Sequence, residues 1–324
     1  MNYQNIVVIG GGVLGSQIAY QTAYSGYNVT ILVREDDDKT KIRKTLKKLK
    51  DTYLDTINQM ASKSGSDDSI WARGIASKES FKKDECIKKA EEAYENIVID
   101  TNQEEVLKDC DLVIESITEI LEIKTDLYKQ IAPLLPEKTV IVTNSSTLLP
   151  SKMADATKRP EKYLAMHFAN HIWKNNISEI MGHSGTDQKY FDEIVAFAES
   201  ISMIPLKVNE EKSGYLLNSL LVPFLLCAMD LLANGVSDPK TIDDAWKLGT
   251  GAPNGPFEIL DVVGLETARN IALQYQKVPN IFDPLLKKMM LPYNYDGMLD
   301  ILDKYIDEGK LGKSTGEGFY KYDK

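Results

Sequence analysis

The 324-residue sequence has little cysteine and no long apolar segment. Its three cysteines, Cys86, Cys110 and Cys227, are scattered and form no CxxC pair. We therefore expect reduced thiols, with neither a disulfide framework nor a metal site. No run of about 18 apolar residues is present, so a membrane span is not expected. The first five residues lack the basic region and apolar core of a signal peptide, which predicts a cytoplasmic protein.

An excess of positive charge is also missing, since the formal net charge is −10. Proteins that hold nucleic acid through its phosphates usually carry a basic face, so no nucleic-acid partner is expected. An acidic chain can still bind an anionic small molecule through local basic groups and backbone N–H donors.

Strand-like and helix-like segments alternate over the first two thirds of the chain. Residues 5–9 and 28–33 are β-rich runs that flank a glycine turn and a helix-like segment, which together form a βαβ unit. Further strand-like runs lie at 96–100, 112–117, 139–143, 163–168, 177–182 and 203–208. This alternation predicts an α/β fold, a Rossmann-type doubly wound and mostly parallel sheet.

An insertion and a second domain complete the expected architecture. Apolar residues between Ile42 and Met60 recur at steps of three and four, and residues 80–94 follow as a second helix, so we expect an inserted antiparallel helical hairpin. After Val208 no strand is expected. Helices are predicted at 215–234, 239–248, 265–275, 282–290 and 297–308. The predicted domains are therefore 1–208, which binds a dinucleotide, and 209–324, which is helical.

The glycine turn indicates the ligand of the first domain. Gly10, Gly12 and Gly15 follow a strand and open a helix, which is the context that this motif requires. The first glycine permits a tight turn, the second lets a pyrophosphate approach, and the third allows the helix to pack closely on the strand. The helix N-terminus then offers unpaired N–H groups to the phosphates. A glycine-rich turn without a ligand is the alternative.

The choice between NAD(H) and NADP(H) stays open at this point. An NAD-binding unit usually places an acidic residue at the end of its second strand to bind the ribose hydroxyls. Here that position falls on Val33, followed by Arg34, which could meet the extra phosphate of NADP. Glu35 or Asp36 could instead serve the ribose, and Arg34 could equally be a solvated turn residue.

Candidate catalytic residues follow the later strands. Oxidation of an alcohol by hydride transfer needs a base, a group that holds it, and donors for the developing alkoxide. His167 lies at the end of a predicted strand, where ligands bind in open α/β sheets, and Glu179 in the next strand can reach it. The run 143–147 places polar side chains at the end of the preceding strand, beside the expected site. Asn218 is an amide in an otherwise apolar helix, and a hydrogen bond in helix packing is its alternative role.

In this combination the sequence resembles the L-3-hydroxyacyl-CoA dehydrogenase family, including its 3-hydroxybutyryl-CoA members. The resemblance covers nearly the whole chain in order, and it is carried by segments 8–15, 143–148, 166–170, 214–223, 255–264 and 312–322. It implies an enzyme of fatty acid metabolism that is a homodimer, with a C-terminal domain that forms the dimer and contributes to substrate binding. The enzyme would transfer a hydride between a nicotinamide cofactor and the 3-carbon of a short-chain acyl-CoA.

The resemblance also implies roles for individual residues. His167 would be the catalytic base, Glu179 would orient it, and Ser146 and Asn218 would bind the reacting oxygen. The expected dinucleotide contacts are Gly10, Gly12, Val13, Leu14, Gly15, Arg34, Glu119, Lys124 and Asn170.

The chain departs from the family beside the expected base. Most members have His-Phe-Phe-Asn-Pro, whereas this sequence has Ala169 and His171 at the third and fifth positions. The altered segment leaves two alternatives open. One is a dehydrogenase of a CoA-free hydroxy acid, such as a sugar acid or a carnitine-like compound. The other is a non-catalytic dinucleotide-binding protein.

Overall fold

The chain folds as two compact units, Met1–Leu216 and Leu217–Lys324. The computed structural model describes residues 3–62, 71–276 and 293–322. The predicted boundary at residue 208 differs from this division, because the segment after the last strand packs with the first unit. The predicted helix 282–290 and nearly all of the predicted loop 62–69 lie outside the described residues.

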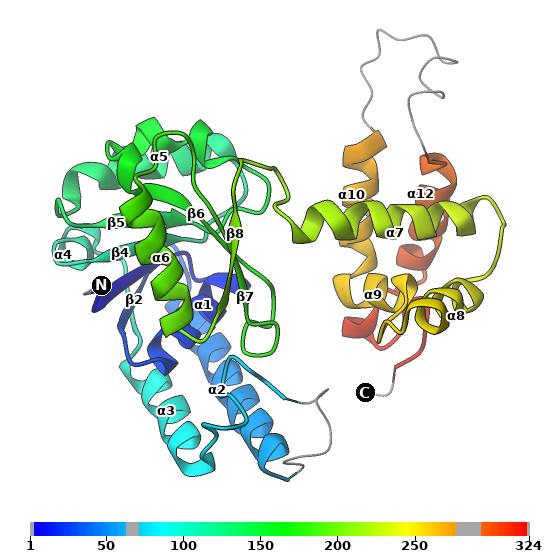
Figure 1. The fold of residues 1–324 in the computed structure, drawn as a ribbon, viewed down its shortest axis with the longest axis horizontal. Coiled ribbons are helices and arrows are strands. Elements are labelled where there is room, and N and C mark those ends of the chain that lie inside the picture. The colour runs from blue at the N-terminus through cyan, green and yellow to red at the C-terminus, as the bar shows by residue number, and fades with distance from the viewer. Residues whose placement is uncertain (1–2, 63–70, 277–292, 323–324) are drawn as a thin grey trace, which may run out of the picture. The chain divides into compact units, whose positions relative to one another are not determined.

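The first unit contains one eight-stranded sheet, with the order β3-β2-β1-β4-β5-β6-β7-β8 (Figure 1). The strands are β1 (Asn5–Ile9), β2 (Asn28–Leu32), β3 (Val98–Asp100), β4 (Leu112–Glu115), β5 (Val140–Thr143), β6 (Tyr163–Phe168), β7 (Ile177–Met181) and β8 (Ile204–Val208). Neighbouring strands are parallel except β6 and β7, which are antiparallel. The predicted α/β sheet is therefore confirmed.

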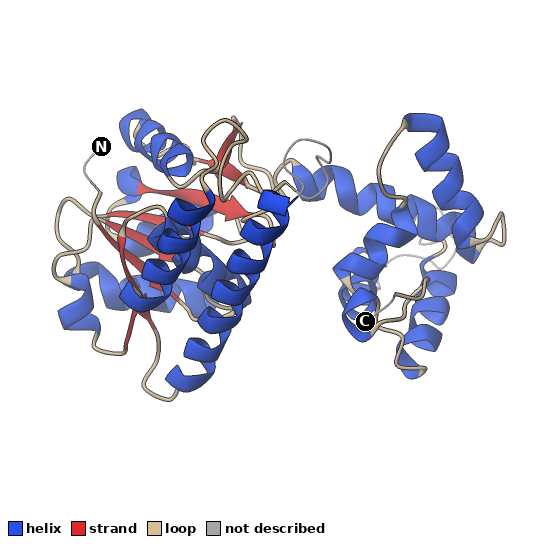
Figure 2. Cartoon of the chain, turned by 90° about the horizontal axis from the view of Figure 1, so that it is seen from below, coloured by secondary structure: helices blue, strands red, loops and turns tan. Residues whose placement is uncertain are grey.

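Helices cover both faces of this sheet (Figure 2). They are α1 (Val13–Tyr24), α2 (Lys39–Ser62), α3 (Lys83–Asn96), α4 (Gln103–Leu107), α5 (Leu121–Ile131) and α6 (Gln188–Ser200), and short 3₁₀ turns lie between α5 and β6. Side chains alternate between the faces along each strand. Ile6 and Val8 of β1 pack with α1, α2, α3 and α6, whereas Val7 and Ile9 pack with α4 and α5. Both faces are buried, as a parallel sheet requires.

The inserted hairpin consists of α2 and α3. Near the start of α2, Arg43 donates hydrogen bonds to the carbonyl oxygens of Tyr94 (3.0 Å) and Ile97 (2.9 Å), at the end of α3. The two helices therefore run antiparallel, as predicted. The buried Tyr53 of α2 donates to the side chain of Gln21 on α1 (2.5 Å), which fixes the hairpin to the helix that follows β1.

The described part of the second unit is helical. Its helices are α7 (Leu217–Ala233), α8 (Pro239–Thr250), α9 (Pro256–Val263), α10 (Leu265–Gln276) and α12 (Tyr295–Asp307). Among its described residues, β pairing is confined to the isolated bridges of Glu317 with Gly312 and Lys321. Across the described part of the whole chain, no helix is long and apolar enough to span a membrane.

Helix α9 was not predicted, although its start carries readable signals. Pro256 occupies the first turn, and the Glu258 carboxylate accepts from the Gly255 N–H (2.8 Å), the return half of a capping box. A distant residue completes the cap, because the buried carboxylate of Asp243 accepts from the N–H groups of Phe257 (2.8 Å) and Glu258 (3.1 Å). A cap supplied from another helix is invisible in the local sequence.

A second buried carboxylate, that of Asp261, binds the segment 312–322. Asp261 of α9 accepts from the N–H groups of Phe319 (2.8 Å) and Tyr320 (2.9 Å). A Cβ at Gly318 would lie 2.0 Å from the Asp261 Oδ1, so only glycine fits there. The Asp261 carboxylate and the edge-on packing of Phe319 against Phe257 therefore hold the segment around residues 318–320 on α9.

Candidate active site

The glycine turn has the geometry of an anion-binding turn. Gly10 has φ of 111°, and a Cβ there would lie 2.5 Å from the Ser116 carbonyl oxygen. A Cβ at Gly15 would lie 2.2 Å from the Gly10 oxygen, so the protein itself requires both glycines. A Cβ at Gly12 would meet no atom within 4 Å. Gly12 thus leaves open space where a ligand can approach.

The first turn of α1 is free to receive negative charge. Gly12 is its N-cap, no side chain accepts from the first N–H groups, and no acidic residue lies in the turn. Val13 is 69% exposed, whereas Leu14 is half-buried against the core. The combination of exposed N–H groups and the positive end of the helix dipole fits the pyrophosphate of a dinucleotide.

His167 and Glu179 face each other across the antiparallel pair of β6 and β7. The His167 Nδ1 lies 3.0 Å from the Glu179 Oε2, and both side chains are buried. The other carboxylate oxygen, Oε1, accepts from the Leu216 N–H (2.9 Å). On the opposite side of the ring, Nε2 lies 3.1 Å from the Ser146 Oγ. The structure therefore brings three of the four predicted catalytic residues together.

This arrangement determines which imidazole nitrogen can react. An ionised carboxylate only accepts hydrogen bonds, so the Nδ1 of His167 carries the proton that faces Glu179. In the neutral ring Nε2 is then the acceptor, and it faces the Ser146 hydroxyl. A base oriented in this way can take a proton from a substrate hydroxyl, or return one, at Nε2.

Glu119 and Lys124, predicted to contact the dinucleotide, also support the loop that carries Ser146. The Glu119 Oε1 accepts from the Ser145 Oγ (2.5 Å) and from the Thr147 N–H (2.7 Å). Burial raises the pKa of Glu119, but the hydrogen bonds from Ser145 and Thr147 and the charge of Lys124 outweigh it, so the net shift is downward. The Lys124 Nζ lies 3.6 Å from the Glu119 Oε2.

Glu115 lies next to this loop and was not predicted as a site residue from the sequence. It is fully buried at the end of β4 and accepts from Lys124 Nζ (2.5 Å) and the Ile117 N–H (2.8 Å) through Oε1. Its Oε2 accepts from the hydroxyls of Tyr128 (2.7 Å) and Thr143 (2.7 Å). A charged residue inside an apolar strand was the available signal, because such residues are almost never buried without partners.

The segment after His167 contains a residue with left-handed backbone, at the position where the family pattern has proline. His171 has φ of 58°, a conformation closed to proline, whose ring fixes φ near about −65°. Gln17 of α1, a second residue missed by the sequence analysis, holds this turn. Its Nε2 donates to the Asn170 Oδ1 (2.8 Å), and its Oε1 accepts from the His171 N–H (2.8 Å). The dinucleotide-binding helix is thus tied to the segment beside the base.

The first unit alone does not account for two of the predicted contacts, those of Asn218 and Arg34. Asn218 belongs to α7 in the second unit, so its pairing with the reacting oxygen stays a prediction. Val33 is buried and its side chain has no polar atom with which to bind a ribose hydroxyl, whereas Arg34 is exposed.

Comparison with known proteins places the chain in one family. Residues 5–211 match the family described as 3-hydroxyacyl-CoA dehydrogenase, NAD binding domain, and residues 214–322 match its C-terminal domain. The human mitochondrial hydroxyacyl-coenzyme A dehydrogenase is 30% identical over 98% of this chain and 91% of its own. The 3-hydroxybutyryl-CoA dehydrogenase of Clostridioides difficile is 32% identical over 70% of this chain and 76% of its own.

A solved structure of a diketoreductase, from work on the dual catalysis of dicarbonyl compounds, has a TM-score of 0.80 and 41% identity, covering 99% of this chain and 100% of its own. The two family matches together account for both units. The chain therefore belongs to the 3-hydroxyacyl-CoA dehydrogenase family of nicotinamide-dependent oxidoreductases.

Proposed function

We propose that this protein reduces the 3-keto group of a short-chain acyl-CoA, or oxidises the corresponding 3-hydroxyl. The observation that carries the proposal is the hydrogen-bonded series Ser146–His167–Glu179 in a chain whose relatives are named for this reaction. The bound nicotinamide would supply or accept the hydride at the 3-carbon. The protein must then hold a proton beside the 3-oxygen.

His167 would hold that proton at Nε2. In the reduction, Nε2 gives the proton to the oxygen as the hydride arrives at carbon, and Glu179 stabilises the ring through Nδ1. Ser146 would donate to the developing alkoxide, and Asn218 would be the second donor. Because His167 and Glu179 are buried, their charges are less screened than they would be in water.

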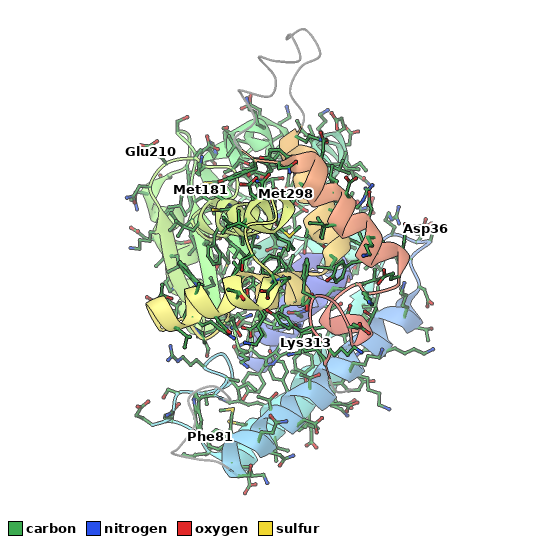
Figure 3. The ribbon with its side chains drawn as sticks, turned by 90° about the vertical axis from the view of Figure 1, so that its right-hand side faces the viewer. Asp36, Phe81, Met181, Glu210, Met298 and Lys313 are labelled. Atoms are coloured by element: carbon green, nitrogen blue, oxygen red, sulfur yellow. The ribbon has the colours of Figure 1, made fainter. Side chains whose placement is uncertain are left out.

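We further propose NAD(H) as the cofactor in preference to NADP(H). The Arg34 guanidinium already pairs with Asp37 (3.3 Å) and Asp36 (3.5 Å). Four consecutive acidic residues, 35–38, follow Arg34, and Asp36 lies at the edge of the view in Figure 3. The local charge is thus negative where the 2′-phosphate of NADP would come, and that charge disfavours the phosphate.

One assay tests the reaction and the cofactor together. Acetoacetyl-CoA should be reduced, with kcat/KM for NADH at least about tenfold above that for NADPH, a difference of about 1.4 kcal/mol. The double variant Asp36→Ser/Asp37→Ser should lower the ratio of kcat/KM for NADH to kcat/KM for NADPH. Asp192→Ser on α6 should leave this ratio unchanged. Absence of turnover in a protein that binds NADH would contradict the acyl-CoA proposal. A wild-type preference for NADPH would contradict only the cofactor assignment.

A CoA-free dicarbonyl compound is the second candidate substrate. The observation that favours it is the 41% identity to a diketoreductase over the full length of both chains. The relatives do not favour the predicted CoA-free hydroxy acids or a non-catalytic role. Parallel assays with acetoacetyl-CoA and a CoA-free 3,5-diketo ester distinguish the two substrates. A higher kcat/KM for the ester would replace the acyl-CoA in our proposal.

The expected homodimer and cytoplasmic location stay predictions. Apolar side chains are exposed on the second unit, including Leu220 (75%), Val236 (66%) and Leu248 (87%). Exposed apolar residues of this kind are compatible with an interface between two copies of the unit.

A further inference from the structure

Tyr215 adopts a backbone conformation that its residue type disfavours. Its φ is 51°, in the left-handed region, and its neighbour Gly214 has φ of 81°. Such a conformation persists in a non-glycine residue only where the surrounding contacts enforce it, and these positions cluster at functional sites. Tyr215 is buried, and it lies just before Leu216, the last residue of the first unit.

The Tyr215 ring covers one face of the His167 imidazole. The ring centroids are 4.8 Å apart and the planes differ by 18°, so the two rings are stacked. The ring nitrogens of His167 already face Ser146 and Glu179. Hydrogen bonds at the ring nitrogens restrain movement of the ring perpendicular to its plane less than movement within that plane. The stacked ring opposes that movement.

The Tyr215 hydroxyl reaches the loop on the other side of the site. It donates to the Ser145 carbonyl oxygen (2.8 Å), and Ser145 directly precedes Ser146. The next residue, Leu216, donates its N–H to the Glu179 Oε1 (2.9 Å). Tyr215 therefore contacts both His167 and the Ser145 carbonyl oxygen, and the next residue, Leu216, contacts Glu179.

We propose that Tyr215 is a positioning residue that keeps the His167 ring and the Ser146 hydroxyl correctly placed relative to each other for proton transfer. This inference rests on the proposed function, in which His167 transfers the proton to or from the substrate oxygen. Tyr215 acts through His167 and Ser146. Its ring fixes the base, and its hydroxyl fixes the loop that carries Ser146.

Two variants separate the ring from the hydroxyl. Tyr215→Phe keeps the stacked ring and frees the Ser145 oxygen, so kcat should fall about fivefold, the effect of one neutral hydrogen bond. Tyr215→Leu removes both contacts, and kcat should fall about 10²-fold, as expected when a reacting group is misplaced. The KM for acetoacetyl-CoA and the Kd for NADH should change less than twofold in both.

A double-mutant cycle tests whether the hydroxyl acts through Ser146. In a Ser146→Ala background, Tyr215→Phe should have no further effect on kcat, because the group that the loop positions is gone. Tyr27→Phe is the matched control. It removes a tyrosine hydroxyl that bonds the Ser200 Oγ (2.6 Å) outside the site, and kcat should not change. Equal losses from Tyr215→Phe in both backgrounds would overturn the proposed link to Ser146.

A measurement without turnover separates this inference from the proposed function. Diethyl pyrocarbonate modifies histidine rings, and mass spectrometry reports each site, with His171 and His183 as internal references. Tyr215→Leu should speed modification of His167 at least about tenfold relative to wild type, with the reference rates unchanged. An unchanged His167 rate would overturn the role of the ring. Inactive wild-type protein with the expected modification rates would contradict the proposed reaction alone.

Discussion

Replacing His167 with glutamine is expected to lower kcat for acetoacetyl-CoA reduction by about 10²–10⁴-fold, the usual contribution of a general acid or base. Glutamine can still hydrogen-bond Ser146 or Glu179, but it cannot give or take a proton near neutral pH. Steady-state kinetics at saturating NADH measure the effect. The Kd for NADH should be unchanged, because the proposed phosphate contacts lie at the glycine turn and not at β6.

His183→Gln is the matched control for that variant. His183 lies in the loop after β7, where its Nε2 lies 3.0 Å from the Pro160 carbonyl oxygen, and no proposed step uses it. Its loss should leave kcat within about twofold, since loop substitutions away from the site usually have small effects. Normal turnover by His167→Gln would mean that another group carries the proton, and the proposed mechanism would be wrong.

The pairing of His167 with Glu179 shows how much of the site could be predicted from the sequence. The two short apolar runs predicted neighbouring strands, and the family resemblance predicted the pair. The register of β6 and β7 sets the two residues opposite each other. The two strands could be predicted because strand-like runs and short connections between them can be seen in neighbouring residues of the sequence. The turn from His167 to His171 depends on Gln17 of α1, more than 150 residues away, and no local pattern reveals that contact.

Glu115 and α9 show where sequence reasoning failed. Glu115 lies in an otherwise apolar strand, and its partners come from α5 and β5, so the strand pattern was correct while the buried charge went unexplained. The start of α9 is completed by Asp243, which lies on α8. In both cases a distant partner satisfies a buried polar group, and single-sequence patterns do not report such partners.

The second large effect is expected at Glu115. Glu115→Ala would remove the hydrogen-bonded carboxylate of the buried Lys124 ammonium and leave it only the Glu119 Oε2, 3.6 Å away. It would also remove the acceptor of the Tyr128 and Thr143 hydroxyls. Breaking a buried ion pair on one side typically costs about 3–5 kcal/mol, so the free energy of unfolding of the first unit should fall by about that amount. Denaturant unfolding followed by tryptophan fluorescence measures it, since Trp71 and Trp173 lie in this unit.

A paired variant distinguishes the cost of buried charge from the role of Lys124 in the site. Glu115→Leu combined with Lys124→Met removes both charges and fills similar volume, so much of the lost stability should return. Activity should not return with it, because Glu119 loses the nearby ammonium, and the Tyr128 and Thr143 hydroxyls beneath the Ser146 loop still lack their acceptor. If both stability and kcat recovered, the ion pair would be only a packing element. A stable but inactive double variant would mean that Glu115 and Lys124, together with the hydroxyls that Glu115 holds, position the loop that carries Ser146.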